Sequence, residues 1–395
     1  MLTSSPVFRP GATVFATVAI LAAVSAFGRA EPSASAAESS PLDTLSRVER
    51  QGADNEIARD AWRRLSQASP EQLPQLLAAL DRATPLGANW IRAAIDAIAE
   101  RALANGEKLP LDGLEAFVKD TGHLPRARRL AYEWVSRADK TAPDRLIPGM
   151  LDDPSVELRR DAVSRVLTRA AEQLEAKETD AAAATYRQAV TAARDPDQVK
   201  TAADALKKLG QPVDLARHYG FVMHWHVVGP FDNAGKKGFD VAYPPETAPG
   251  KPADPAAVFE GKMGSVEWLD HTTTDELGHV DLNTLLGKHK GVIAYAVAEL
   301  NSPADRPVEF RMGSGNANKI WLNGELLHKA EIYHANVKMD QYVARGRLKS
   351  GRNILLLKIC QNEQTEDWAA DWKFQLRACD ATGGAVPLET EPHAN

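Results

Sequence analysis

Two histidines, His224 and His226, come closest in this sequence to the spacing of a reactive site. They lie in the segment FVMHWHVVGPF, residues 221–231, which reads as a β-strand. Residues two apart on a strand face the same side, so both imidazoles are placed to share a metal ion. The neighbouring sequence offers no third ligand at metal-site spacing. We therefore expect exposed or core histidines here, and the sequence predicts neither a metal site nor a cofactor.

Motifs of catalysis are missing from the sequence. It contains no G-x-S-x-G, no H-E-x-x-H, no nucleotide-binding glycine loop and no C-x-x-C-H haem site. Acidic residues are numerous, but the sequence alone does not assign any pair as the two carboxylates of a glycosidase. We therefore predict no catalytic residue, and an undetected hydrolase acting on glycans stays as an alternative.

Aromatic residues favour a binding role. Sugars present flat C–H faces that stack on aromatic rings, while nearby polar side chains contact the hydroxyl groups. Trp368, in the inter-strand segment QNEQTEDWAADW, is the first candidate for an exposed stacking platform. The alternative is that Trp368 folds back over the end of the domain. Tyr333 and His334, in another inter-strand segment, are the second candidates.

Composition and the first residues limit the class of protein. The chain has 395 residues, 25% of them charged, a formal net charge of −6 and no long basic run, which argues against nucleic-acid binding. Residues 1–30 combine two arginines with an apolar run and small residues, which is typical of a signal peptide. Residues 31–40 are expected to form a flexible linker. The pattern predicts an exported protein, periplasmic or extracellular, with no integral membrane span after signal removal.

Residues 41–215 are expected to be helical, because apolar residues recur there at spacings of three and four. One pattern repeats: a basic residue, any residue, Ala, then apolar or aromatic residues at the next position and three later. The copies begin at Arg59, Arg92, Arg129, Arg160 and, more weakly, Lys200. A period of 30–40 residues predicts stacked helical hairpins. The repeated Arg is expected to cap or cross-link adjacent helices.

One helical unit carries a resemblance to a known family. Residues 146–167, LIPGMLDDPSVELRRDAVSRVL, resemble a HEAT repeat through the Asp-Asp-Pro turn and the Val-x-x-Arg-x-x-Ala-Val helix. Part of 175–209 is equally similar to a TPR-like hairpin. The resemblance implies an α-solenoid with a protein-binding surface. A stalk or platform is the alternative.

Residues 220–385 are expected to form an antiparallel β-sandwich, followed by a disordered tail over 386–395. Short alternating runs separated by turn residues support this assignment. The expected strands cover 221–231, 291–300, 308–313, 318–323, 325–329, 341–348, 353–360 and 372–379.

Residues 291–380 resemble the galactose-binding-like jelly rolls that are attached to many glycoside hydrolases. The matching segments are Trp321-Leu322-Asn323-Gly324, Gly351-x-Asn353, Leu355-Leu356-Leu357-Lys358 and Trp372-x-Phe374-x-Leu376-Arg377. The resemblance implies a jelly roll whose ligands, in this fold, include sugars, lipids and proteins. Relatives often carry acidic residues before the Trp-containing strand. Here Asn316 and Asn318 occupy that segment, and we take them as candidate ligand contacts.

Two local predictions follow. Asn323-Gly324 are expected to be the central residues of a type I′ hairpin, with Trp321 opposite Leu326 and Ile320 opposite Leu327. Cys360 and Cys379 are expected to stay unpaired. This second prediction assumes that 353–360 and 372–379 form one hairpin, which places the two thiols at opposite ends of it.

Three interpretations of function remain open. The first is an exported, non-catalytic binding protein in which a helical-repeat platform carries a carbohydrate-binding-like sandwich, with a glycan or a cell-surface protein as partner. The second is a protein–protein interaction scaffold with a structural sandwich. The third is the undetected hydrolase.

Overall fold

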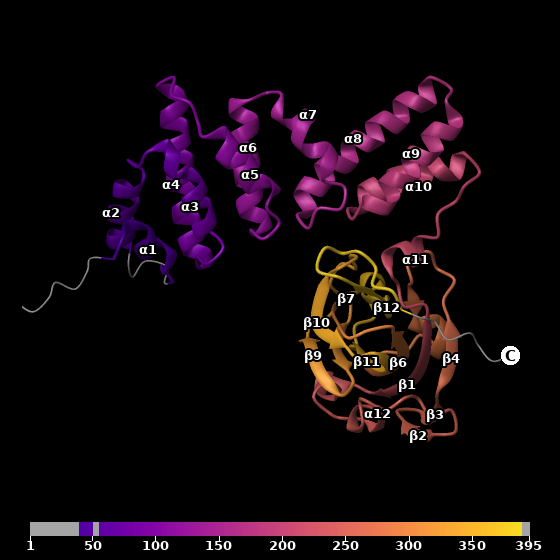
Figure 1. Ribbon diagram of the computed structural model, residues 1–395. Coiled ribbons are helices and arrows are strands. Elements are labelled where there is room, and N and C mark those ends of the chain that lie inside the picture. The colour runs from indigo at the N-terminus through magenta and orange to yellow at the C-terminus, as the bar shows by residue number, and fades with distance from the viewer. Residues whose placement is uncertain (1–38, 50–54, 389–395) are drawn as a thin grey trace, which may run out of the picture.

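A computed structural model describes residues 39–49 and 55–388 of the chain, which consist of a helical half followed by antiparallel sheets (Figure 1). The expected signal peptide (1–30) and most of the expected linker lie outside the described residues. Ser40, which we assigned to the linker, caps the first helix by accepting a hydrogen bond from the N–H of Asp43. Within the described residues, no helix is both long enough and apolar enough to cross a membrane.

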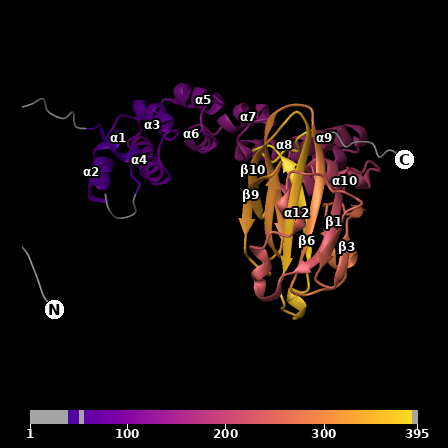
Figure 2. The same ribbon diagram turned by 90° about the horizontal axis from the view of Figure 1, so that it is seen from below.

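The helical half contains α1 to α11, and helices α1–α6 extend away from the sheets (Figure 1; Figure 2). Proline occupies the first turn of several helices, including α1, α4, α6 and α10, where its missing N–H costs no hydrogen bond. Helix α8 begins instead after Ser155, whose side chain caps it. The bounds are α1 Pro41–Ser46, α2 Asn55–Leu65, α3 Leu73–Ala79, α4 Pro85–Ala104, α5 Leu111–Lys119, α6 Pro125–Ala138, α7 Ala142–Leu146, α8 Val156–Glu175, α9 Thr179–Ala192, α10 Pro196–Lys208 and α11 Leu215–Tyr219.

The repeated sequence pattern falls on every second helix: α2, α4, α6, α8 and α10. Its Ala residues are buried where helices approach, as shown by Ala94, Ala131 and Ala162, each at most 1% exposed. The repeated arginines then join one such helix to the next. Three contacts do this: Arg92 to Glu133 at 3.4 Å, Arg129 to Asp161 at 2.5 Å, and Arg160 to Asp197 at 2.6 Å. The expected cross-linking role of these arginines is confirmed for these three.

A buried ion pair also connects consecutive helical units. Arg128 of α6 is fully buried and donates two hydrogen bonds of 2.7 Å to the carboxylate of Asp153. Its Nε–H bonds the carbonyl of Val118 at the end of α5. Asp153 belongs to the Asp-Asp-Pro turn before α8, so this pair fixes α5, α6 and the start of α8 together.

The second half contains two facing antiparallel sheets. Six strands run in the order β4-β1-β6-β11-β8-β9, four run in the order β10-β7-β12-β5, and β2 and β3 form a separate pair. The bounds are β1 His224–Asp232, β2 Val258–Gly261, β3 Gly264–Glu267, β4 Leu269–Thr272, β5 Val280–Asp281, β6 Val292–Ser302, β7 Arg306–Ser314, β8 Ala317–Leu322, β9 Glu325–Ala330, β10 Tyr342–Leu348, β11 Gly351–Gln361 and β12 Lys373–Cys379. Two short helices, α12 Pro244–Thr247 and α13 Leu282–Leu286, lie in the connections.

An apolar core fills the space between the two sheets. Trp225 and Leu357 contribute from the six-stranded sheet, and Phe310, Phe374 and Leu376 contribute from the four-stranded sheet. Phe374 and Leu376 alternate along β12 and point into this core. A strand with one solvated face would expose the positions between and after them, but Gln375 and Arg377 are only 3% and 2% exposed. Arg377 is covered because Asp340, in the β9–β10 connection, pairs with its guanidinium.

The Asn323-Gly324 turn is a type I′ hairpin, with both residues at positive φ (51° and 92°). Trp321 pairs with Leu326, as predicted. Ile320 pairs with His328 and not with the predicted Leu327, because an extra residue bulges out of β9 between these pairs. The turn is fastened to β11, since Asn323 Nδ2 donates to Asn353 Oδ1 over 2.8 Å.

The two cysteines are free and buried. The assumption that residues 353–360 and 372–379 form one hairpin is wrong. Strand β11 pairs with β6 and β8, while β12 pairs with β7 and β5, so Cys360 and Cys379 lie in different sheets. Each strand finds its partners far along the chain, which a local reading of the sequence does not reveal.

The halves meet at Gly220, which has φ 75° and follows α11. The carbonyl of Gly220 accepts a hydrogen bond from Ala378 of β12, and Val222 donates to the carbonyl of Leu376. A Cβ at Gly220 would approach the Ala378 carbonyl to 2.7 Å.

The β half extends beyond its predicted C-terminal boundary at residue 385, because Val386 is 7% exposed and belongs to the core. The expected tail therefore starts too early, and its residues 389–395 lie outside the described part.

Candidate functional site

Three residues that the sequence singled out separately come together on the surface: Tyr333, His334 and Trp368. We call them the aromatic patch. The rings of His334 and Trp368 meet edge to face with centroids 5.2 Å apart, and those of Tyr333 and His334 are 6.5 Å apart. The first two residues come from the β9–β10 connection, and Trp368 comes from a short 3-10 turn, Asp367–Ala369, between β11 and β12. Two distant segments therefore build one site.

Tyr333 is held from the segment that follows β1. Asn233 Nδ2 donates to the Tyr333 hydroxyl over 3.2 Å, and the ammonium group of Lys236 lies 5.1 Å from the ring centroid. Burial raises the pKa of Tyr333 to about 12, although the Asn233 hydrogen bond opposes this. The phenol is therefore protonated at neutral pH. Because it accepts from Asn233, it retains its own proton as a hydrogen-bond donor.

His334 and Trp368 are also anchored locally. His334 has a φ of 58°, uncommon for a residue other than glycine, and its Nε2 lies 2.6 Å from Asn362 Oδ1. Next to Trp368, Ala369 is fully buried, and its carbonyl accepts a hydrogen bond from Lys290. These contacts fix the backbone next to Trp368 and thereby the position of its indole ring.

The indole of Trp368 is open to solvent. Trp368 is 65% exposed, and Ile332, which precedes Tyr333 in the chain, is 52% exposed. The alternative that Trp368 folds back over the end of the domain is therefore not what the structure shows. An exposed indole beside a half-buried phenol and an imidazole offers a flat apolar surface bordered by hydrogen-bonding groups.

The other two predicted site residues are not available to a ligand. Asn316 and Asn318 are both 0% exposed. Asn316 Nδ2 donates to Gln361 Oε1 and to the carbonyl of Asp371, and Asn318 Nδ2 donates to the carbonyl of Asn316. Strand β7 runs to Ser314, one residue beyond the end expected from the sequence, and β8 begins at Ala317, one residue before its expected start. Both asparagines are therefore enclosed at the joint between these strands.

A second cluster lies at the other end of β1. His224 and His226 share one face, as predicted, and Asp270 of the neighbouring strand β4 joins them. His224 Nε2 lies 2.5 Å from Asp270 Oδ1, and His226 Nδ1 lies 3.5 Å from the same oxygen. Asp270 was not predicted from the sequence, because it lies 46 residues after His224. Antiparallel pairing of 269–272 with β1 would have been the signal, but this segment shows little apolar alternation.

A third charged cluster is internal. The ammonium group of Lys358 is fully buried and donates to Glu246 Oε2 over 2.7 Å and to the carbonyls of Phe239 and Val241. Burial lowers the pKa of Lys358, whereas the Glu246 carboxylate opposes that change. The hydroxyl of Tyr295 donates to the same carboxylate oxygen. These bonds fasten the β1–β2 connection to the outer face of the six-stranded sheet, which is a structural role.

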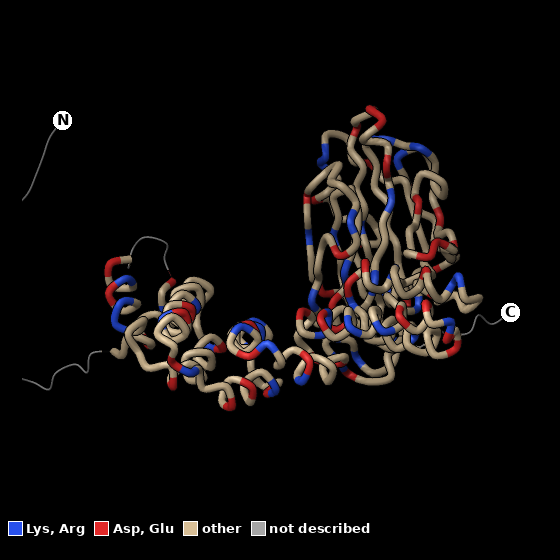
Figure 3. The backbone as a smooth tube through the Cα atoms, turned by 90° about the horizontal axis from the view of Figure 1, so that it is seen from above, with Lys and Arg blue, Asp and Glu red and all other residues tan. Residues whose placement is uncertain are grey.

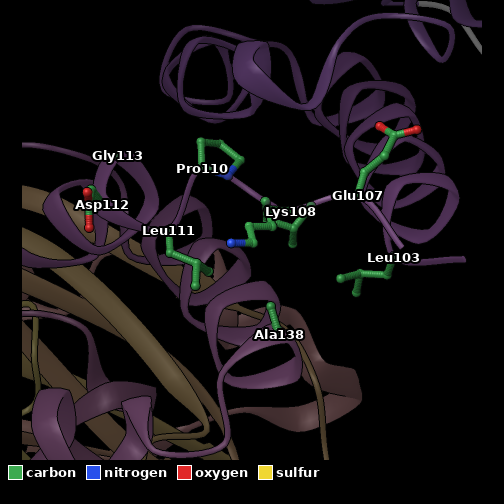
Figure 4. Close-up of a pocket in the computed structure, with 9 residues that line it drawn as sticks. Leu103, Glu107, Lys108, Pro110, Leu111, Asp112, Gly113 and Ala138 are labelled. Atoms are coloured by element: carbon green, nitrogen blue, oxygen red, sulfur yellow. The ribbon is translucent and has the colours of Figure 1, made fainter. Parts of the chain in front are cut away.

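The helical half contains an open hollow of about 530 Å³ between the end of α4 and the start of α5 (Figure 4). The charged residues Glu107 and Asp112 stand on opposite sides of it in this view. Because its polar groups do not converge on one point, we assign no ligand to it. Lys/Arg and Asp/Glu residues are interspersed over both described halves (Figure 3), so surface charge does not single out a site either.

Comparisons with known proteins identify no family. No family model matches the chain, and no curated protein matches its sequence. Among solved structures, the chain is matched to a crystal structure of a β-glucosidase from Kluyveromyces marxianus, with 10% identity and a TM-score of 0.25. The match covers 78% of this chain and 38% of that one, so the chain spans well under half of its length. A likeness this weak carries no argument about fold or function.

Proposed function

We propose that the protein is an exported, non-catalytic binding protein whose β half binds a glycan through the aromatic patch. In this proposal the β half is a galactose-binding-like jelly roll, and the helical half is a HEAT- or TPR-like solenoid that serves as its platform. Export rests on the signal-peptide pattern of residues 1–30, and the protein would act in the periplasm or outside the cell.

One observation carries the proposal: Trp368 is 65% exposed and stands against His334, which adjoins Tyr333. Exposed apolar and aromatic groups that gather at one place on a surface mark interaction sites. Sugar rings suit this surface because their C–H faces stack on the indole, while the Tyr333 hydroxyl and the His334 imidazole offer hydrogen bonds to the sugar hydroxyl groups.

The alternative is a protein–protein interaction scaffold in which the sheets are structural. It is supported by the recurrence of the repeated sequence pattern on α2, α4, α6, α8 and α10, since arrays of helical repeats present extended surfaces. A glycan-active hydrolase is the second alternative. It lacks an assigned carboxylate pair, so we rank it below the other two.

The test is a glycan array probed with the whole mature chain, followed by titration calorimetry on the best ligand. Replacing Trp368 by Ala should weaken glycan binding by about tenfold or more, because stacked aromatics anchor such sites. The melting temperature of the Trp368→Ala variant should change little, since about two thirds of Trp368 is already exposed to water.

The matched control is Ile57→Ala. Ile57 is 61% exposed but lies on α2 in the helical half, so this change removes a comparable exposed apolar side chain far from the patch. It should leave glycan affinity unchanged. A protein that binds no glycan on the array, or a Trp368→Ala variant that binds as tightly as the unmodified chain, contradicts the proposal and favours the scaffold.

A further inference from the structure

The cluster formed by His224, His226 and Asp270 brings three metal-ligand atoms to one point. One ligand atom from each side chain lies within 4.8 Å of the other two. Both imidazoles face the same carboxylate oxygen, from 2.5 Å and 3.5 Å. The two rings are nearly perpendicular, with an interplanar angle of 79° and centroids 5.1 Å apart. Their nitrogens therefore approach the carboxylate from different directions, as ligands around a single ion do.

The sheet itself fixes this arrangement. Trp225, between the two histidines, is fully buried in the core between the sheets and donates its indole N–H to the carbonyl of Val222. Its burial turns His224 and His226 to the outer face. In the antiparallel register, His226 lies directly opposite Asp270, while His224 lies opposite Thr272. Asp270 is thus the cross-strand neighbour of one histidine and the diagonal neighbour of the other.

The geometry points to a binding site for a divalent cation of the late first-row transition metals, and we take Zn²⁺ as the representative ion. The ligands are His224 Nε2, His226 Nδ1 and the Asp270 carboxylate. We propose this site as a feature of the protein separate from glycan binding. Imidazole nitrogens suit Zn²⁺, Cu²⁺ or Ni²⁺, whereas Ca²⁺ and Mg²⁺ prefer oxygen ligands only. The ligand set therefore selects the class of ion.

Distances agree with this assignment after a small adjustment. Ligand atoms about 2.1 Å from a tetrahedral Zn²⁺ lie roughly 3.4 Å apart. The separation of 3.5 Å between His226 Nδ1 and Asp270 Oδ1 already fits. The contact of 2.5 Å between His224 and Asp270 must lengthen, which the Asp270 side chain can allow because it is 68% exposed.

The site is open. The side chains of His224, His226 and Asp270 are 36%, 22% and 68% exposed. Three protein ligands leave at least one position of a tetrahedral shell for water or an external ligand, unlike the closed four-ligand shell of a structural zinc site. The site and the aromatic patch lie at opposite ends of β1, which places them roughly 25 Å apart. Each can therefore be tested without the other.

The experiment is a titration of the metal-stripped full chain with Zn²⁺ by calorimetry, together with a Co²⁺ titration followed by visible absorption. We expect one ion per chain, a rise in melting temperature with Zn²⁺, and Co²⁺ bands of the intensity seen in four-coordinate sites. The His224→Gln, His226→Gln and Asp270→Asn variants should each weaken Zn²⁺ binding by about tenfold or more.

His271→Gln is the matched control. His271 adjoins Asp270 on the same strand but lies opposite the inward-facing Trp225, so its side chain belongs to the other face. This variant should bind Zn²⁺ like the unmodified chain. Two results would overturn the assignment: no saturable binding of Zn²⁺ by a chain with the circular dichroism of folded protein, or equal weakening by His271→Gln and His224→Gln.

Discussion

Residue types alone predicted part of the candidate site. Trp368, Tyr333 and His334 were chosen because they are aromatic or polar residues in inter-strand segments, and the structure brings them together. Asn316 and Asn318 were chosen through the jelly-roll resemblance, from their place at the start of the Trp-containing strand, and both are buried. The difference is the length of the connection. A long connection leaves side chains in solvent, whereas the tight joint between β7 and β8 encloses them, and the exact end of a strand is poorly encoded in its sequence.

Gly324 provides a test at the scale of one residue. Gly324→Val should destabilise the β half by about 1–3 kcal/mol, because a β-branched residue resists the φ of 92° required there. Thermal or urea unfolding measures the loss. Gly324→Asn is the control and should cost less, because Asn tolerates positive φ. Equal loss of stability in both variants would mean that the added side chain itself, and not the backbone conformation, causes the destabilisation.

At the scale of elements, hydrophobic periodicity predicted the individual strands well, but it did not predict which strands pair with one another. All eight expected strands exist, with ends shifted by a few residues. The short strands β2 to β5 were missed, because they have only two to four residues each and little buried surface. The pairing of β11 with β12 was also wrong, since sheet membership depends on contacts between distant segments. Asp270 was missed as a ligand for the same reason: it is brought to His226 only by the pairing of β4 with β1.

The helical units provide a test at the scale of elements through two arginines of different burial. Arg128→Ala should cost about 3–5 kcal/mol, because it leaves the buried Asp153 carboxylate without its partner. Arg160→Ala, which removes the half-exposed contact with Asp197, should cost no more than about 1 kcal/mol. Urea unfolding of the full chain followed by circular dichroism at helical wavelengths compares the two variants. A larger loss of stability for Arg160→Ala would show that the surface contacts, and not the buried Arg128–Asp153 ion pair, hold the units together.

At the scale of the whole molecule, the two halves are joined by more than a linker. Helix α11 ends at Tyr219, Gly220 follows it, and the next residues pair with β12 of the four-stranded sheet. Arg377 of β12 donates to the carbonyl of Tyr219 and lies 5.7 Å from its ring centroid. The order of a helical half followed by a β half was readable from the change in residue pattern after Leu215. The joint between the halves could not be predicted from the sequence, because it depends on the conformation of Gly220 and on strand β12, which lies far along the chain.

We expect His218 to make this joint sensitive to acid. Burial, with added repulsion from the Arg194 and Arg377 guanidinium groups, lowers the pKa of His218 to about 4 from its ordinary 6.5. Between these two values the unfolded chain binds a proton that the folded chain does not. The stabilisation from neutral His218 is therefore complete above pH 6.5 and is lost as the pH falls toward 4, by up to about 3 kcal/mol.

The measurement is urea unfolding of the full chain and of the His218→Gln variant, at about pH 7.5 and about pH 4.5. Carboxylates that titrate over the same range act equally on both proteins, so the difference between the two isolates His218. The unmodified chain should lose more stability on acidification than the variant, because Gln cannot take up the proton that His218 excludes when folded. Equal losses would mean that His218 is already hydrated in the folded protein, and the joint around α11 would then be looser than its contacts with β12 indicate.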